Sequence, residues 1–157
     1  MFAVIKMFYS NKLSYLRERN GLTYDKIGKL INLDSGTYFH YEKEELLIPI
    51  KHLITLADYY NVSIDYIFDF TNLTNYPTPK NNIEKSLTSI RLKEFRKEHK
   101  ITQEKLAKIL NISRSTIAEY ERGTNIIATP FLYTICKKFN ISADYLLGKT
   151  DSPKYLK

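Results

Sequence analysis

Hydrophobic residues recur at every third or fourth position through most of this chain, with polar residues between them. In the segment QEKLAKIL, for example, Leu106, Ile109 and Leu110 fall on one face of a helix, and Thr102 precedes it as an N-cap. No strictly alternating pattern competes with this one in the second half of the chain. The pattern therefore predicts a succession of short amphipathic helices.

The second half divides into five such helices. Their expected N-caps carry a hydroxyl group just before an apolar run: Ser89, Thr102, Ser113 and Ser142. The remaining helix, the fourth, is expected to begin at Thr129-Pro130, with proline at its first helical position. Gly123 is expected to end the third helix in a left-handed conformation, and Gly148 to close the fifth.

The chain repeats itself with an offset of 79 residues. From Leu13/Leu92 to Thr71/Thr150 the two copies align without a gap, and more than a quarter of the aligned positions are identical. Many of the other pairs exchange one apolar residue for another, so the copies predict two similar folding units. We expect a first domain over residues 1–71, a linker over 72–84 and a second domain over 85–157.

Charge and aromatic residues are distributed unequally between the copies. Residues 1–79 carry 8 Lys and Arg against 9 Asp and Glu, a net charge of −1, whereas residues 80–157 carry 16 against 8, a net charge of +8. A basic block of this size attracts polyanions, and nucleic acid is the leading candidate. The first copy holds 14 of the 21 Phe and Tyr residues, which are enriched where proteins meet proteins.

Catalytic and metal-binding patterns are not found in the sequence. The single cysteine, Cys136, lies in an apolar pattern and is expected in the core, and the three histidines lack the spacing of metal ligands. We therefore expect no cofactor, no metal and no enzymatic activity. The apolar N-terminal segment MFAVIKMFY is too short to span a bilayer and lacks the features of a secretory signal, so no membrane association is expected.

The segment TQEKLAKILNISRSTIAEYERG resembles the helix-turn-helix of the XRE family, the family of Cro and the phage repressors, and the later ISADYLLG resembles its fifth helix. The resemblance covers nearly all of residues 87–150 and extends weakly to 10–71. It implies an all-α fold with two tandem five-helix lambda-repressor-like helix-turn-helix domains, joined by a short linker.

Helix 114–121 is then the one expected to enter the major groove of DNA. With Ile117 and Tyr120 inward, Arg114 can donate two hydrogen bonds to guanine, and Ser115 and Thr116 can bond a base or a phosphate. Glu119 could accept from cytosine N4 or orient Arg114.

The resemblance also assigns roles around this helix. It implies that Gln103 helps to clamp the DNA backbone, and that Thr124 and Asn125 contact phosphate. Ser113 completes the expected DNA-binding set. A first-helix arginine pairs in this family with the glutamate that ends the third helix, which implies the structural ion pairs Arg96–Glu121 and Arg17–Glu42.

The first copy departs from the motif where DNA would be read. Ser35 and Gly36 replace Arg114 and Ser115, and Tyr24 replaces Gln103. Phe39 stands on the expected outer face, and the segment EKEE at 42–45 places three carboxylates where phosphates would approach. Our interpretation is that the first copy keeps the shape of the fold and has lost its DNA surface.

These features predict a sequence-specific regulator of transcription, a repressor, that binds double-stranded DNA in the cytoplasm at the nucleoid. A homodimer is expected, with the first domain and its N-terminal arm supplying the contacts. Three alternatives stay open for these residues: the arm covers its own domain, both copies contact one DNA in tandem, or residues 1–71 hold a protein partner. An interaction protein of the antitoxin or anti-repressor type is the alternative function.

Overall fold

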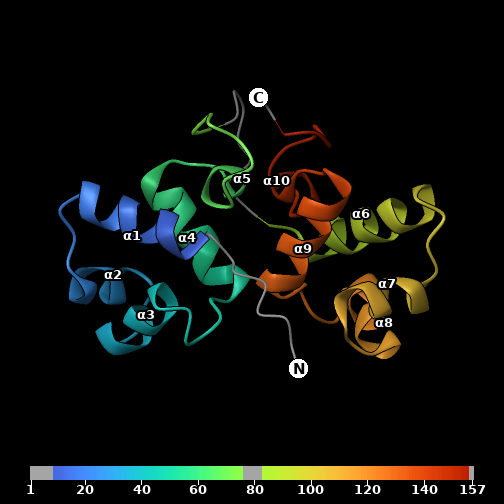
Figure 1. Cartoon of the computed structure of the whole chain (residues 1–157), viewed down its shortest axis with the longest axis horizontal. Helices are drawn as coiled ribbons and strands as arrows, with labels where there is room; N and C mark the ends of the chain where they lie inside the picture. The colour runs from blue at the N-terminus through green and yellow to red at the C-terminus, as the bar shows by residue number, and fades with distance from the viewer. Residues whose placement is uncertain (1–8, 76–82, 156–157) are drawn as a thin grey trace. The chain divides into compact units, whose positions relative to one another are not determined.

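The computed structural model describes residues 9–75 and 83–155, and these two ranges form two compact units (Figure 1). The described residues contain ten helices and no strand, which confirms the all-α prediction. Most of the N-terminal arm and residues 76–82 of the predicted linker lie outside the described residues. No helix within the described ranges is long and apolar enough to cross a membrane.

Each unit consists of five helices in the same order. The first unit contains α1 (Tyr9–Arg19), α2 (Tyr24–Leu30), α3 (Ser35–Glu42), α4 (Ile50–Tyr60) and α5 (Ile64–Ile67). The second contains α6 (Lys85–Glu98), α7 (Gln103–Leu110), α8 (Arg114–Arg122), α9 (Thr129–Phe139) and α10 (Ala143–Leu146). The pairs α2–α3 and α7–α8 are the two helix-turn-helix motifs, which confirms the tandem architecture (Figure 1).

Most of the predicted caps of the second unit are confirmed. The hydroxyls of Thr102, Ser113 and Ser142 each accept a backbone hydrogen bond at the start of α7, α8 and α10. The prediction for Ser89 is wrong, because α6 begins at Lys85 and the Ser89 hydroxyl donates to the carbonyl of Ser86 inside the helix. The spacing of apolar residues in this helix would be the same wherever the helix began. The pattern therefore did not reveal the additional turn that starts at Lys85.

The start of α9 also differs by one position from the prediction. The N-cap is Ala128, so Thr129 is the first helical residue and Pro130 the second. Proline is tolerated in the first turn because the backbone N–H groups there have no helical partner.

The two units end corresponding helices with different residues in the left-handed region. Gly123 and Gly148 have φ values of 78° and 80°, as predicted for Gly123, whereas the first unit has Glu44 and Asp69 at these places with φ values of 61° and 64°. A side chain is strained in this region. Each acidic residue is held by α1, since Ser10 donates to Glu44 at 2.6 Å and Lys12 pairs with Asp69 at 3.1 Å.

The turn between the first two helices of the motif is tighter in the first unit. The N–H of Leu33 donates to the carbonyl of Gly28 at 2.7 Å, whereas the corresponding bond from Ile112 to Ala107 is 3.0 Å. A Cβ atom at Gly28 would lie 2.6 Å from the Leu33 carbonyl oxygen. Glycine therefore permits an approach of α2 to this turn that alanine could not make without movement.

The cores share their aliphatic framework but differ near the ion pair. Leu13 and Ile27 are completely buried in the first unit, as is Leu106 in the second. Cys136 is also completely buried, as expected. In the first unit Tyr38 and Tyr60 take the places of an isoleucine and a phenylalanine, and their buried hydroxyl groups have no hydrogen-bond partner among the residues that the structure describes.

Candidate nucleic-acid interface

Hydroxyl groups hold the first turn of α8 together. Ser113 Oγ accepts a hydrogen bond from the Thr116 N–H at 3.2 Å, which caps the helix. The same oxygen lies 2.9 Å from Ser115 Oγ and 2.8 Å from Thr116 Oγ1. The Ser113 hydroxyl is thus occupied in positioning the helix start, while Ser115 is exposed and Thr116 is half-buried.

Arg114 lies at the outer side of this helix start. Ile117 is completely buried and Tyr120 is buried, so α8 packs through that face and presents the other. Arg114 is exposed, and within the described ranges it belongs to no ion pair. Its guanidinium is therefore available for a bidentate contact of the kind that arginine makes with guanine.

Gln103, which the resemblance places on the DNA backbone, contacts a carboxylate of its own unit. Its side-chain amide donates to Glu121 Oε2, while Arg96 Nε donates to Glu121 Oε1 at 2.6 Å. The residue stands at the first position of α7, where the backbone N–H has no partner within the helix. The side chain therefore belongs to the Arg96–Glu121 cluster in this structure, and the backbone N–H is the group that faces outward from the helix start.

Glu119 is directed to the loop that follows α8. Its carboxylate accepts a hydrogen bond from Asn125 Nδ2 at 3.2 Å, and its backbone carbonyl accepts from the Thr124 N–H at 3.1 Å. No hydrogen bond or ion pair joins Glu119 to Arg114 in the part of the chain described. The carboxylate thus positions the exposed Thr124–Asn125 segment rather than Arg114.

The same ion pair occurs in both units. Arg17 Nε donates to Glu42 Oε1 at 2.8 Å and its Nη1 donates to the Leu22 carbonyl at 3.1 Å. Arg96 makes the corresponding bonds to Glu121 and to Ile101, the latter at 2.9 Å. The carboxylate side chains are 2% and 4% exposed, so the pairs link the first and third helices from within each unit.

Aromatic rings cover the corresponding face of the first unit. The Arg17 guanidinium lies over the ring of Tyr24, 4.1 Å from its centroid. Tyr24 in turn contacts Phe39 edge to face, with centroids 5.3 Å apart, and Lys43 Nζ lies 5.3 Å from the Phe39 centroid. These stacked side chains thus occupy the face that in the second unit carries Gln103 and Arg114.

Only two of the three carboxylates expected on this face are exposed. Glu42 is turned into the unit by its bond to Arg17, which corrects the expectation, whereas Glu44 and Glu45 are exposed. Glu45 Oε2 lies 2.5 Å from His40 Nδ1. The acidic character of the face is thus smaller than the sequence indicates.

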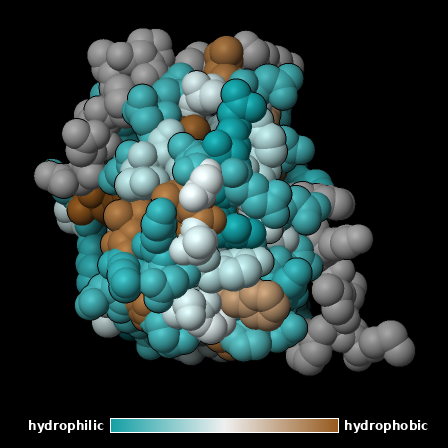
Figure 2. All heavy atoms as spheres, turned by 90° about the vertical axis from the view of Figure 1, so that its left-hand side faces the viewer, coloured by the Kyte–Doolittle hydropathy of each residue, from teal (hydrophilic) through white to brown (hydrophobic). Residues whose placement is uncertain are grey.

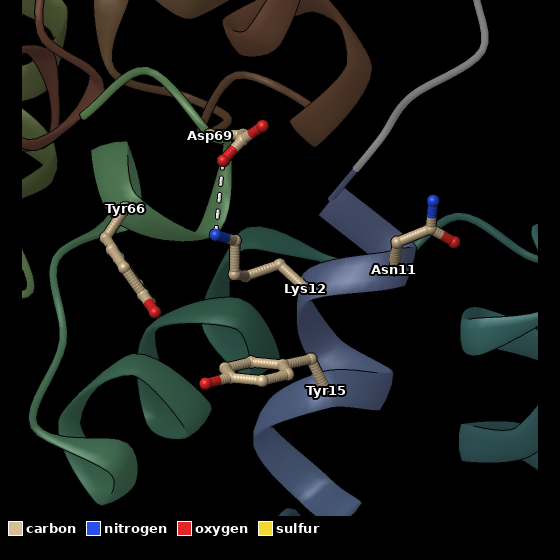
Figure 3. A pocket seen from close by; sticks show the side chains of 5 residues that line it. All are labelled: Asn11, Lys12, Tyr15, Tyr66 and Asp69. Atoms are coloured by element: carbon tan, nitrogen blue, oxygen red, sulfur yellow. Dashed lines mark ion pairs between the residues drawn. The ribbon is translucent and has the colours of Figure 1, made fainter. Parts of the chain in front are cut away.

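One cation that the sequence analysis did not select has a clear role. Arg91 donates to the carbonyls of Tyr145 and Thr150, at 2.6 and 2.7 Å, and to Asp151 at 2.8 Å. Its counterpart Lys12 pairs with Asp69 beside an open hollow that Tyr15 and Tyr66 also line (Figure 3). A cation at the same place in both copies is the signal that could have revealed this link between the first and fifth helices.

Over residues 9–75 and 83–155, no three side chains of His, Cys, Asp or Glu gather in an arrangement that could hold a metal ion.

Comparison with known proteins agrees with the geometry. A family model described as helix-turn-helix matches the chain twice, at residues 13–67 and 92–146. These ranges contain both α2–α3 and α7–α8, the pairs that the structure presents as helix-turn-helix motifs.

Several curated proteins are similar to part of the chain. The antitoxin PezA of Streptococcus pneumoniae is 40% identical over 58 residues, which cover 37% of this chain and 37% of that protein. The uncharacterized HTH-type transcriptional regulator YobD of Bacillus subtilis is 36% identical over 63 residues, 40% of this chain and 56% of that protein. The HTH-type transcriptional regulator ImmR of the same organism is 39% identical over 64 residues, 41% of this chain and 50% of that protein. The match thus spans between about a third and just over half of each relative.

Proposed function

The chain belongs to the helix-turn-helix family of the XRE type, and we propose that it is a sequence-specific regulator of transcription that binds double-stranded DNA through its second unit. The observation that carries this proposal is the exposed Arg114 at the capped start of α8. The relatives named as transcriptional regulators support the same assignment.

In the proposed complex the N-terminal part of α8 enters the major groove. Arg114 donates two parallel hydrogen bonds to guanine O6 and N7, a contact that discriminates against other bases by about 1–3 kcal/mol. Ser115 and Thr116 contact a base edge or a phosphate. The backbone N–H of Gln103 and the Thr124–Asn125 segment hold the phosphates on either side, since helix starts and amide side chains favour anions.

The charge of the second unit supplies the affinity that does not depend on sequence. Its described residues carry 14 Lys and Arg against 8 Asp and Glu, whereas those of the first unit carry 7 against 9. Phosphate contacts release counterions, so binding should weaken steeply as salt rises. Occupation of a promoter is sufficient for repression, and we propose a repressor that acts at the nucleoid in the cytoplasm.

A single motif reads few base pairs, and we propose that the protein acts as a homodimer. Two copies of α8 then meet half-sites about 34 Å apart, one turn of DNA. The first unit contributes to dimer assembly rather than to base recognition. Its Tyr24 and Phe39 rings pack together over the face on which a side chain would have to contact the bases.

The experiment is a selection of bound duplexes from a random pool by the full chain, followed by titrations of the selected and a scrambled duplex at several salt concentrations. The doubly substituted variant Arg114→Ala with Ser115→Ala removes the proposed reading groups. Its matched control carries Ser35→Ala and Gly36→Ala, the same positions of the first unit.

We expect the first variant to lose the preference for the selected duplex and the control to keep it. If the control loses the preference equally, both units read DNA in tandem. If the full chain selects no sequence at low salt, the proposed function is wrong.

A second candidate function is supported by one of the relatives. The antitoxin PezA is 40% identical over 58 residues, and an antitoxin-like protein would use residues 1–71 to hold a protein partner, with DNA binding secondary. A full chain that remains monomeric while binding DNA weakly would favour this alternative. Stable self-association with tight, selective DNA binding would favour the regulator.

A further inference from the structure

The loop between α3 and α4 exposes two adjacent leucines. Leu46 is 47% exposed and Leu47 is 55% exposed, and the loop also carries Lys43, Glu44 and Glu45. Among the described residues, Ile90 is the one comparably exposed large hydrophobic side chain of the second unit. Figure 2 views the first unit from the side of α1 to α3, where hydrophobic groups interrupt a mainly hydrophilic surface. We call residues 43–47 the α3–α4 patch.

The second unit uses the corresponding positions differently. Asn125 stands where the first unit has Leu46, and it is bonded to Glu119. Ile126 stands in the place of Leu47 and is half-buried rather than exposed. At these two positions the second unit thus has an exposed polar residue and a half-buried apolar one, whereas the first unit has two exposed leucines. Exposed leucines next to carboxylates have no favourable contact with a phosphate backbone, so a protein surface is the better match.

Hydrogen bonds also fix the conformation of this loop. The N–H groups of Glu45 and Leu46 both donate to the His40 carbonyl, at 3.0 and 3.3 Å. Glu44 accepts from Ser10 at 2.6 Å. An interface formed by a preorganised loop avoids much of the entropy cost of ordering it on binding.

The charges of the patch indicate which protein surface fits. A two-fold interface presents the same residues from both sides, so charges around its apolar centre attract rather than repel one another only where both signs are present. Lys43 supplies the positive charge and Glu44 and Glu45 supply the negative charge, with Leu46 and Leu47 beside them. A purely basic or acidic partner would leave part of this set opposed by like charge.

We propose that the α3–α4 patch is the centre of an isologous interface between two copies of this chain. Leu46 and Leu47 pack against the same residues of the second copy, and Lys43 lies opposite the carboxylates of Glu44 and Glu45 of that copy. A stable interface buries roughly 800 Å² from each partner, so neighbouring surface such as the half-buried Phe39 takes part. The inference specifies the dimer of the proposed function and is independent of DNA reading.

The first test is sedimentation equilibrium of the full chain without DNA. We expect the unaltered chain to dimerise and the variant Leu46→Asp with Leu47→Asp to raise the dissociation constant at least tenfold. Ile90→Asp, which places the same charge on an exposed residue of α6, should leave dimerisation unchanged. A monomeric unaltered chain, or a dimeric Leu46→Asp, Leu47→Asp variant, overturns the proposal.

A second test separates the interface from an effect on folding. One full-length variant carries Lys43→Glu and another carries Glu44→Lys with Glu45→Lys, so each alone opposes like charges across the two-fold axis. We expect each to be monomeric and an equimolar mixture to form the heterodimer. Self-association of either variant alone, or a mixture that stays monomeric although both chains are folded by circular dichroism, overturns the proposal.

These measurements do not involve DNA, so they can fail while DNA reading stands. Conversely, the Arg114→Ala, Ser115→Ala variant should keep the dimer of the unaltered chain, because its changes lie in the second unit. Binding of a different protein to the patch by a monomeric chain would support the antitoxin-type function and contradict the second copy as occupant.

Discussion

Gln103 donates its side-chain amide to Glu121, the same carboxylate that receives the Arg96 guanidinium. The start of α7, the last turn of α6 and the end of α8 are therefore joined at one buried charge. The first unit reaches the same result differently, because Tyr24 in place of Gln103 stacks on the guanidinium of its arginine. Each unit thus completes its ion pair with a third side chain from the start of its second helix.

Loss of one partner from this cluster should destabilise the second unit strongly. Arg96→Met leaves the 4%-exposed Glu121 side chain without its cation, and breaking a buried pair in this way costs about 3–5 kcal/mol. Urea denaturation of the full chain followed by circular dichroism measures this loss. Lys97→Met, at an exposed position of the same helix, is the control and should change stability by less than about 0.5 kcal/mol. A similar small change for Arg96→Met would show that the pair contributes little.

Arg114→Ala should weaken binding to the selected duplex while affecting a scrambled duplex far less. The lost bidentate contact is worth about 1–3 kcal/mol, which corresponds to about 5- to 150-fold in affinity. Fluorescence anisotropy with both duplexes at one salt concentration gives the ratio. Ser35→Ala changes the matching position of the first unit and should leave both affinities unaltered. An equal loss on both duplexes would instead identify Arg114 as a phosphate contact.

Gly28→Ala should destabilise the first unit. The new Cβ would lie 2.6 Å from the Leu33 carbonyl oxygen, so the turn must move, and overpacking of this kind costs about 1–3 kcal/mol. Gly36→Ala is the matched control in α3, because its Cβ would approach only the Asp34 side chain, at 3.1 Å. That change should be neutral or stabilising by up to about 1 kcal/mol, since alanine favours a helix over glycine. Thermal unfolding measures both effects. A lower melting temperature for Gly36→Ala than for Gly28→Ala would refute this account of the turn.

The first unit should lose stability in alkali. Burial, with a further contribution from the nearby Glu42 carboxylate, raises the pKa of Tyr38 and of Tyr60 above the ordinary value of a tyrosine. A pKa that is higher in the folded state means that the unfolded state releases its proton first. The contribution of these two tyrosines to the free energy of unfolding is therefore fully present below about pH 10, the ordinary pKa of a tyrosine. It is lost as the pH rises above that value.

Tyr60→Phe tests this dependence, since the second unit already has Phe139 at the corresponding place. We expect the variant to be as stable as the unaltered chain at pH 7, because within the described ranges the Tyr60 hydroxyl has no hydrogen-bond partner to lose. It should also lose less free energy of unfolding between pH 9 and pH 11. Denaturant titrations at those pH values measure the difference, and an unchanged slope would exclude Tyr60 as a source of the alkaline instability.

Several features of the fold could be predicted because they depend on neighbouring residues. The cap at Thr102 requires a hydroxyl and a backbone N–H three residues later, and the end at Gly123 requires a residue that accepts the left-handed region. The family resemblance implied the Arg17–Glu42 and Arg96–Glu121 pairs, and their recurrence at the same offset in both copies favoured a structural role. The Ser89 cap was wrong, since an amphipathic pattern does not mark the residue at which a helix begins.

The sequence alone thus determined the repeat, the order of the helices, the face of α8 that is buried and the basic character of the second unit. These follow from local hydrogen bonding and from the spacing of apolar residues, which any chain with this pattern shares. Only the tertiary structure decided that Gln103 belongs to the buried cluster, that Glu42 turns inward and that Leu46 and Leu47 are exposed. Those outcomes depend on which side chains from distant helices meet. A side chain that is buried at such a contact is no longer available on the surface, and the sequence pattern does not show which side chains these are.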